Sequence, residues 1–244
     1  KKEIIKRQKL IEALNANEIT RDEIREYLNP IYDLERLITR ITYQSANPRD
    51  LIAFRDSLKM LPPIKMLLSD IPCELVDEIN EEFDELKDIY ELLLTSIEDE
   101  PPISLRDGDI IKGGYNEEVD RLRDAKTKGK TWLAELEASE REKTGIKNLR
   151  IKFNKVFGYY LEVTNSFKDL VPDYYVRKQT LTNAERYITP ELKELEDTIL
   201  GAEDRLTSLE YELFRQIRQN IADSVSRIQK TARAIAQIDV FASL

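Results

Sequence analysis

The side chains best suited to chemistry gather between residues 143 and 186. This segment holds nine Lys and Arg against four Asp and Glu, whereas the other 200 residues carry a net charge of −14. It also holds seven of the 19 aromatic residues in the chain. Clustered cations with aromatic neighbours are typical of surfaces that bind nucleic-acid phosphates. The net charge of −9 over all 244 residues argues against a generally basic nucleic-acid binder, so any such surface is local.

Two polar runs in this segment have the spacing of strands. In residues 149–154 apolar and polar side chains alternate, which puts Lys152 and Asn154 on one face, and Lys155 follows at the expected turn. A second run contains Lys178, Gln179, Thr182 and Asn183. Cations and amides at strand intervals suit phosphates, which are held by charge and hydrogen bonds without base reading. The same pattern also fits an ordinary solvated sheet surface with an aromatic core, and composition alone leaves both readings open.

Composition excludes several kinds of catalytic site. The chain has no histidine, so Ser-His-Asp and Cys-His catalysis and His-ligated zinc are unavailable. Cys73 is the single cysteine, which excludes an intrachain disulfide and suits a reducing compartment. We therefore expect no enzyme activity, no metal and no cofactor in this chain. It begins at Lys1 without a Met or a signal peptide, so we also expect it to be a piece of a longer protein.

Three motifs that could carry chemistry are better explained as helix surface or helix core. Residues 128–131 read KGKT, but a phosphate loop needs a glycine where Asp124 stands and a strand before it. Phe83 followed by Glu85 resembles a mismatch-reading wedge, yet it falls within a periodic acidic run. Glu117 and Glu118 fit the start of a helix, where carboxylates are favourable.

Periodicity predicts a mainly α fold. Helical spacing of apolar residues runs through residues 1–115, including one helix from Leu75 to Ile97, and an outgoing arm helix follows over 116–143. Thr144 and Gly145 then interrupt the helix, and residues 144–188 form an inserted β module. Its expected strands cover residues 149–154, 157–164 and 174–179.

A long returning helix is expected over residues 189–244. Thr189 and Pro190 form an N-cap followed by a proline in the first turn, and no other proline occurs before the end of the chain. The apolar spacing of three and four residues is typical of a coiled-coil seam. We expect the 116–143 helix to cover this seam in the antiparallel direction, so that two arm helices hold the β module away from the helical body.

The β module also carries a family resemblance. Residues 141–164 (REKTGIKNLRIKFNKVFGYYLEVT) and 171–192 (VPDYYVRKQTLTNAERYITPEL) strongly resemble the clamp region of the bacterial MutS mismatch-repair family. Residues 107–115 (DGDIIKGGY) and 29–36 (NPIYDLER) resemble its lever region. The resemblance covers essentially the whole chain and is most specific over residues 105–200.

The resemblance implies a helical lever bundle with an inserted clamp, and duplex DNA as the partner. In this family two clamps close around the duplex in a homodimer and contact its backbone. The resemblance places ATP and Mg in an ATPase domain that is absent from this chain. It also implies a MutL-type protein partner and no association with membrane. The implied location is the bacterial cytoplasm, in association with the nucleoid. DNA proximity carries over to Lys152, Asn154, Lys155, Lys178, Gln179, Thr182 and Asn183. Thr182 stands where the family often has Lys, which weakens the expectation for that contact.

Two other functions remain open at this stage. One is a MutS paralogue that acts in recombination. The other is a coiled-coil scaffold that binds only protein, which explains the helices and the acidity but not the basic aromatic module.

Overall fold

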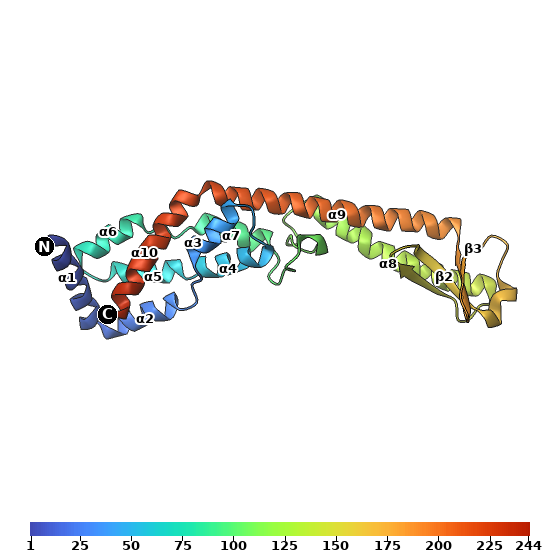
Figure 1. Cartoon of the computed structure of the whole chain (residues 1–244), viewed down its shortest axis with the longest axis horizontal. Coiled ribbons are helices and arrows are strands. Elements are labelled where there is room, and N and C mark those ends of the chain that lie inside the picture. Colours follow the sequence, from blue (N-terminus) through green and yellow to red (C-terminus); the bar gives the residue numbers. More distant parts are fainter. The chain divides into compact units, whose positions relative to one another are not determined.

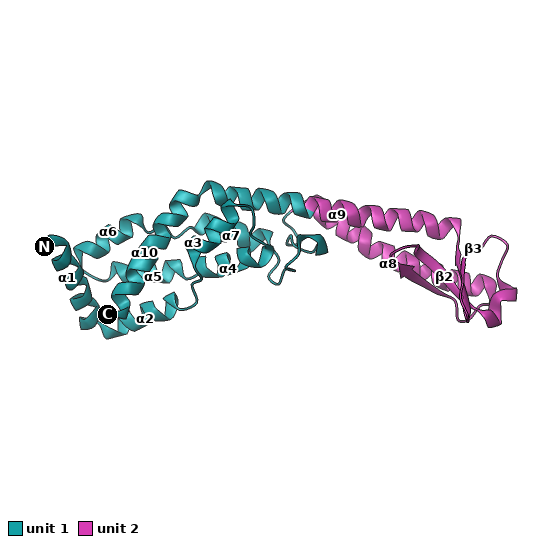
Figure 2. Ribbon diagram, viewed as in Figure 1, with its two compact units in different colours: residues 1–115, 210–244 teal, residues 116–209 magenta.

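The computed structural model describes all 244 residues, and they form two compact units. Unit 1 consists of residues 1–115 and 210–244, and unit 2 consists of residues 116–209 (Figure 2). Helices dominate both units, so the prediction of a mainly α fold is confirmed. One helix, α9 (Pro190–Asp223), begins in unit 2 and ends in unit 1 (Figure 1).

Unit 1 is a helical bundle whose helices begin at recognisable caps. Asn47 forms a capping box with Asp50, and Asp33 accepts a hydrogen bond from the Arg36 amide at 2.9 Å. Phe54, Phe83 and Phe214 are among its fully buried side chains. The helices are α1 (Lys2–Ala16), α2 (Glu18–Leu28), α3 (Leu34–Thr42), α4 (Pro48–Leu58), α5 (Leu61–Ser69), α6 (Glu74–Glu82), α7 (Lys87–Ser96) and α10 (Val225–Ser243).

The helix expected from Leu75 to Ile97 is two helices, α6 and α7, so that prediction was wrong. Leu86 has a left-handed backbone with φ of 51° and is fully buried. The break is held from α10: the Asp84 amide donates to Thr231 Oγ1 at 3.1 Å, and Arg227 binds the Asp84 carboxylate at 2.8 Å. Contacts distant in sequence therefore outweigh the local helical pattern. Phe83 is a core residue, as expected, although it lies just beyond the end of α6.

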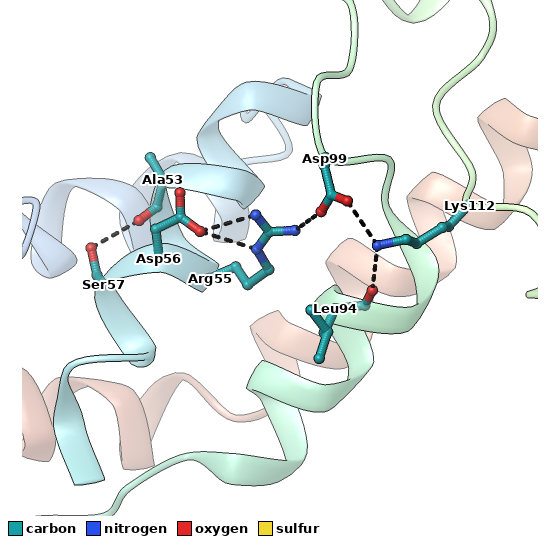
Figure 3. Close-up of polar contacts among 7 residues, drawn as sticks. All are labelled: Ala53, Arg55, Asp56, Ser57, Leu94, Asp99 and Lys112. Carbon is teal, nitrogen blue, oxygen red and sulfur yellow. Dashed lines mark hydrogen bonds and ion pairs between the residues drawn. The ribbon is translucent and has the colours of Figure 1, made fainter. Parts of the chain in front are cut away.

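The segment after α7 is tied back to the bundle by a polar cluster (Figure 3). Arg55 of α4 pairs with Asp99 at 2.6 Å, and Lys112 pairs with the other Asp99 oxygen at 3.1 Å. Ile97 and Ile111 form an isolated antiparallel bridge beside this cluster, and the short 3-10 helix η1 (Leu105–Asp107) lies between them in the chain. The cluster therefore fixes a segment that has little regular structure of its own.

Unit 2 contains two antiparallel helices and one sheet. Asn116 caps α8 (Glu117–Thr144) by accepting hydrogen bonds from the amides of Glu118 and Val119. Gly129 of α8 lies so close to α9 that an added Cβ would stand 2.5 Å from Ile199 Cγ1. The glycine of the KGKT motif therefore lies within a helix, where it permits close packing against α9. The expected antiparallel pair of arm helices is confirmed.

The sheet has four antiparallel strands in the order β1-β2-β4-β3. The strands are β1 (Arg150–Asn154), β2 (Gly158–Thr164), β3 (Val176–Thr180) and β4 (Ala184–Ile188), with a 3-10 helix η2 (Asn165–Leu170) after β2. Three strands were expected from the sequence, and the fourth, β4, which pairs with both β2 and β3, was not. The returning helix is also divided: α9 ends at Asp223, and α10 begins after Ser224.

Candidate nucleic-acid interface

The sheet of unit 2 has an inner and an outer face. Leu161, Val163 and Tyr187 of the inner face are buried in a core with Leu136 of α8 and Leu192 of α9. Cross-strand partners have side chains on the same face. Lys152 pairs with Tyr160, Glu162 with Arg186, and Arg186 with Gln179. These five residues lie opposite the inner core, and we call them the outer face.

Polar contacts join the outer-face side chains across three strand pairings. Lys152 Nζ lies 2.7 Å from Glu162 Oε1, and this hydrogen bond raises the pKa of Lys152 above its ordinary value. Arg186 donates to Gln179 Oε1 at 2.8 Å. Its guanidinium lies 4.4 Å from the centre of the Tyr160 ring, a cation–π arrangement that buries the ring to 5 % exposure. The outer face therefore presents two cations and one amide in a fixed arrangement.

Lys178 differs from its neighbours because it lies at a β-bulge. The pairing of β3 with β4 shifts between Arg177 and Gln179, so Lys178 has no direct partner in β4. Its side chain is exposed and forms no ion pair within the chain. A bulge re-aims a side chain, and an unpaired exposed ammonium beside Gln179 is available to an external anion.

The remaining predicted site residues lie in two turns at opposite ends of the sheet. Asn154 is the last residue of β1 and Lys155 begins the β1–β2 turn, whereas Thr182 and Asn183 belong to the β3–β4 turn. Strand β2 separates these ends, and its seven residues span about 20 Å. The structure therefore groups Lys152, Lys178 and Gln179 on or beside the outer face but does not gather all seven residues into one site.

The four turn residues have different surroundings. Asn154 Oδ1 accepts hydrogen bonds from the amides of Val156 at 2.8 Å and Phe157 at 3.3 Å, so this side chain shapes its own turn. Asn165 binds the carbonyl oxygens of Thr182 and Asn183 at 3.0 and 3.1 Å. The side chains of Lys155, Thr182 and Asn183 are exposed. The β3–β4 turn is thus held by its backbone, and its side chains point to solvent.

Sequence reasoning missed three members of the outer face: Tyr160 as a cation platform, Glu162 as an ion-pair partner, and Arg186. Residues 184–188 (AERYI) show no alternation of apolar and polar residues, so the sequence carried no signal for β4. Only the recognition of β4 places Arg186 opposite Glu162, because strand pairing cannot be read from composition.

Three buried or half-buried carboxylates from the arm helices anchor the sheet. Glu137 of α8 accepts the Ile151 amide at 2.7 Å, which satisfies a donor on edge strand β1. Glu196 of α9 accepts the Tyr159 amide. Glu140 is 1 % exposed and accepts the hydroxyls of Tyr174 and Tyr175, both at 2.8 Å. The sheet orientation within unit 2 therefore depends on charged groups of both helices.

Glu140 remains ionised despite its burial. Loss of hydration raises its pKa, but the hydrogen bonds from Tyr174, Tyr175 and Lys143 outweigh that effect and lower the pKa below its ordinary value. In turn, burial and the Glu140 carboxylate raise the pKa of Tyr174 to about 12. This cluster is structural: one Glu140 oxygen, Oε2, joins α8 to the segment before β3 through both tyrosines, and the other, Oε1, pairs with Lys143 of the same helix.

The structure offers no competing metal site or membrane-spanning element. No group of three or more His, Cys, Asp or Glu side chains is arranged to hold a metal ion. None of the helices combines the length and apolar character needed to cross a lipid bilayer.

Comparison with known proteins adds evidence from sequence. A model described as MutS family domain IV matches residues 114–205. The chain is 65% identical over 242 residues, 99% of its length, to the DNA mismatch repair protein MutS of Lachnoclostridium phytofermentans. It is 58% identical over 243 residues, 100% of its length, to the protein of that name in Caldanaerobacter subterraneus subsp. tengcongensis. The match covers 26% and 28% of these relatives, so the chain spans about a quarter of their length.

Proposed function

Since this chain belongs to the MutS family of DNA mismatch repair proteins, we propose that the sheet of unit 2 binds the backbone of duplex DNA without reading its sequence. The observation that carries the proposal is the outer face with its neighbour Lys178. Lys152, Lys178 and Arg186 are cations at strand spacing, and Gln179 adds an amide donor. Such donors bind phosphate oxygens, which are the same at every base pair.

The β3–β4 turn extends this surface. Thr182 and Asn183 are exposed just beyond the end of β3, the strand that carries Lys178. Hydroxyl and amide side chains are frequent phosphate ligands. Asn154 and Lys155 lie at the other end of the sheet, so in this proposal they contact a different part of the duplex or none.

The helices have a mechanical role in this proposal. Helix α9 continues from the sheet-bearing unit into unit 1, so it provides a covalent route between DNA and the rest of a longer protein. An ATPase domain outside this chain, with its ATP and Mg, would be the other end of that route. Coupling between DNA binding and nucleotide binding along this helix requires two conformations of the protein, one favoured by DNA and the other by nucleotide. A homodimer, a MutL-type partner and a nucleoid location belong to the same proposal and come from the family.

The proposal is tested by titrating a fluorescein-labelled 30-base-pair duplex with the chain and following fluorescence anisotropy. We expect weak binding, with a Kd in the non-specific range of about 10⁻⁴ to 10⁻⁶ M. Matched DNA and a duplex with one G·T mismatch should bind equally. Tighter binding to the mismatch would show that this chain reads bases. No binding to either duplex at low salt would favour the protein-scaffold function instead.

A further inference from the structure

Glu162 lies between the two cations of the outer face. One carboxylate oxygen, Oε1, is 2.7 Å from Lys152 Nζ, and the other, Oε2, is 3.6 Å from Arg186 Nε. The Glu162 side chain is 21 % exposed, so it reaches the surface at which a phosphate would arrive. It is the only acid of β2. Its cross-strand partners are Arg186 of β4 and Arg150 of β1, but Arg150 pairs with Glu137 of α8 at 3.1 Å, which leaves Lys152 and Arg186 as the cations in contact with Glu162.

The pairing of Arg186 with Glu162 leaves hydrogen-bonding capacity unused. At 3.6 Å the contact is an ion pair without a hydrogen bond, and Arg186 Nε is buried with no hydrogen-bond partner. The guanidinium is nevertheless fixed in position by the Tyr160 ring and by Gln179. Arg186 is thus held in place by groups other than the carboxylate that offsets its charge.

We propose that Glu162 is an internal counter-ion that competes with DNA phosphate for Lys152 and Arg186 and so limits the affinity of the outer face. This inference rests on the proposed function of the sheet. The Lys152 ammonium has three donors and the Glu162 carboxylate takes one, so a phosphate can bind the other two only within a few ångströms of the carboxylate charge, which it must either tolerate or displace. The uncompensated carboxylate then repels the phosphate. Arg186 is a further phosphate ligand in this proposal, and it stays in place against Tyr160 and Gln179 while Glu162 offsets its charge.

This arrangement has a functional consequence. A clamp surface that binds every phosphate equally must bind weakly enough to release DNA. Lys178 forms no ion pair and attracts DNA with its full charge, whereas the charge of Lys152 is offset by Glu162 at 2.7 Å. The affinity of the outer face for DNA therefore depends on the Glu162 carboxylate as well as on the number of cations.

The test compares Glu162→Gln with the full parent chain in anisotropy titrations of the 30-base-pair duplex over a salt series. Gln keeps the shape and removes the charge. We expect binding tighter by about three- to fivefold at low salt, the equivalent of one exposed ion pair. The plot of log K against log salt should steepen by about one, because freed cations meet more phosphates. Glu142→Gln is the matched control: Glu142 is exposed on the last turn of α8 and makes no ion pair.

A double-mutant cycle identifies the partner. In a Lys152→Gln background, Glu162→Gln should tighten binding less than it does in the parent, because one of the two cations is gone. Equal binding by Glu162→Gln, Glu142→Gln and the parent, with one common salt slope, would overturn the inference while leaving the proposed function intact. Absence of binding by both the parent and Glu162→Gln would remove the proposed function and this inference with it.

Discussion

Gly158 should be one of the positions in unit 2 least tolerant of an added methyl group. It opens β2 with φ of +75°, and a Cβ there would stand 2.0 Å from a carboxylate oxygen of Glu196. That carboxylate accepts the amide hydrogen of Tyr159. Gly158→Ala must therefore force a left-handed alanine and also push a nearly buried carboxylate away from its donor.

The magnitude follows from these two effects. A left-handed conformation costs a residue other than glycine about 1–2 kcal/mol. Loss of the hydrogen bond between Glu196 and the Tyr159 amide adds about 1–3 kcal/mol, because a buried donor is left unsatisfied. The free energy of unfolding of unit 2 should fall by about 2–5 kcal/mol in total. Gly145→Ala is the control: Gly145 has φ of +72° but nothing within 4 Å of an added Cβ, so only the first cost applies.

The assay is urea denaturation followed by tryptophan fluorescence. Trp132 is the only tryptophan of the chain and lies in α8, so the signal reports on unit 2. With a slope of about 1 kcal/mol/M, the midpoint should fall by about 2–5 M in Gly158→Ala and by about 1–2 M in Gly145→Ala, with the larger fall in Gly158→Ala. Equal midpoints for the two variants would refute the reasoning, because they would show that Glu196 is not held against this turn.

Three further perturbations follow from the same structure. Leu206→Asp places a charge at a buried position of α9 and should destabilise unit 2 by several kcal/mol, whereas Arg205→Asp on its exposed neighbour should change the Trp132 midpoint little. Glu140 has a lowered pKa, so its stabilising contribution is present above its ordinary value of 4.5 and is lost as the pH falls through the lowered value. Glu140→Gln should reduce stability at pH 7 and flatten the acid side of the stability profile measured by urea titrations. A labelled ATP analogue should show no saturable binding, because Lys130 lies within helix α8; saturable binding abolished by Lys130→Ala would contradict that expectation.

Much of the fold could be predicted from local pattern. Capping residues such as Asn116 and Thr189 mark helix starts because their side chains satisfy amides within the same turn. The change from helical to alternating periodicity located the β module. The break at Leu86 was not predictable, because it depends on Thr231 and Arg227, more than 100 residues away.

The candidate site was predictable in composition but not in arrangement. Basic and polar residue types marked the segment that forms the sheet, but nothing in their pattern indicated that Lys152 is paired with Glu162. It also grouped Asn154 with the binding residues, whereas the structure shows this side chain binding the amides of its own turn. Both differences depend on which side chains meet across the strands and turns. Predicting those contacts requires the register of the strands as well as the residue types.

The salt dependence of DNA binding by Lys178→Ala tests the central claim most directly. Lys178 is exposed, forms no ion pair and lies beside the outer face, so its loss should leave the fold intact. Lys59→Ala, an exposed lysine of unit 1, is the matched control. We predict that Lys178→Ala weakens duplex binding and lowers the salt slope by about one, while Lys59→Ala binds like the parent. The same Kd and the same salt slope for Lys178→Ala and the parent would contradict DNA binding by this surface.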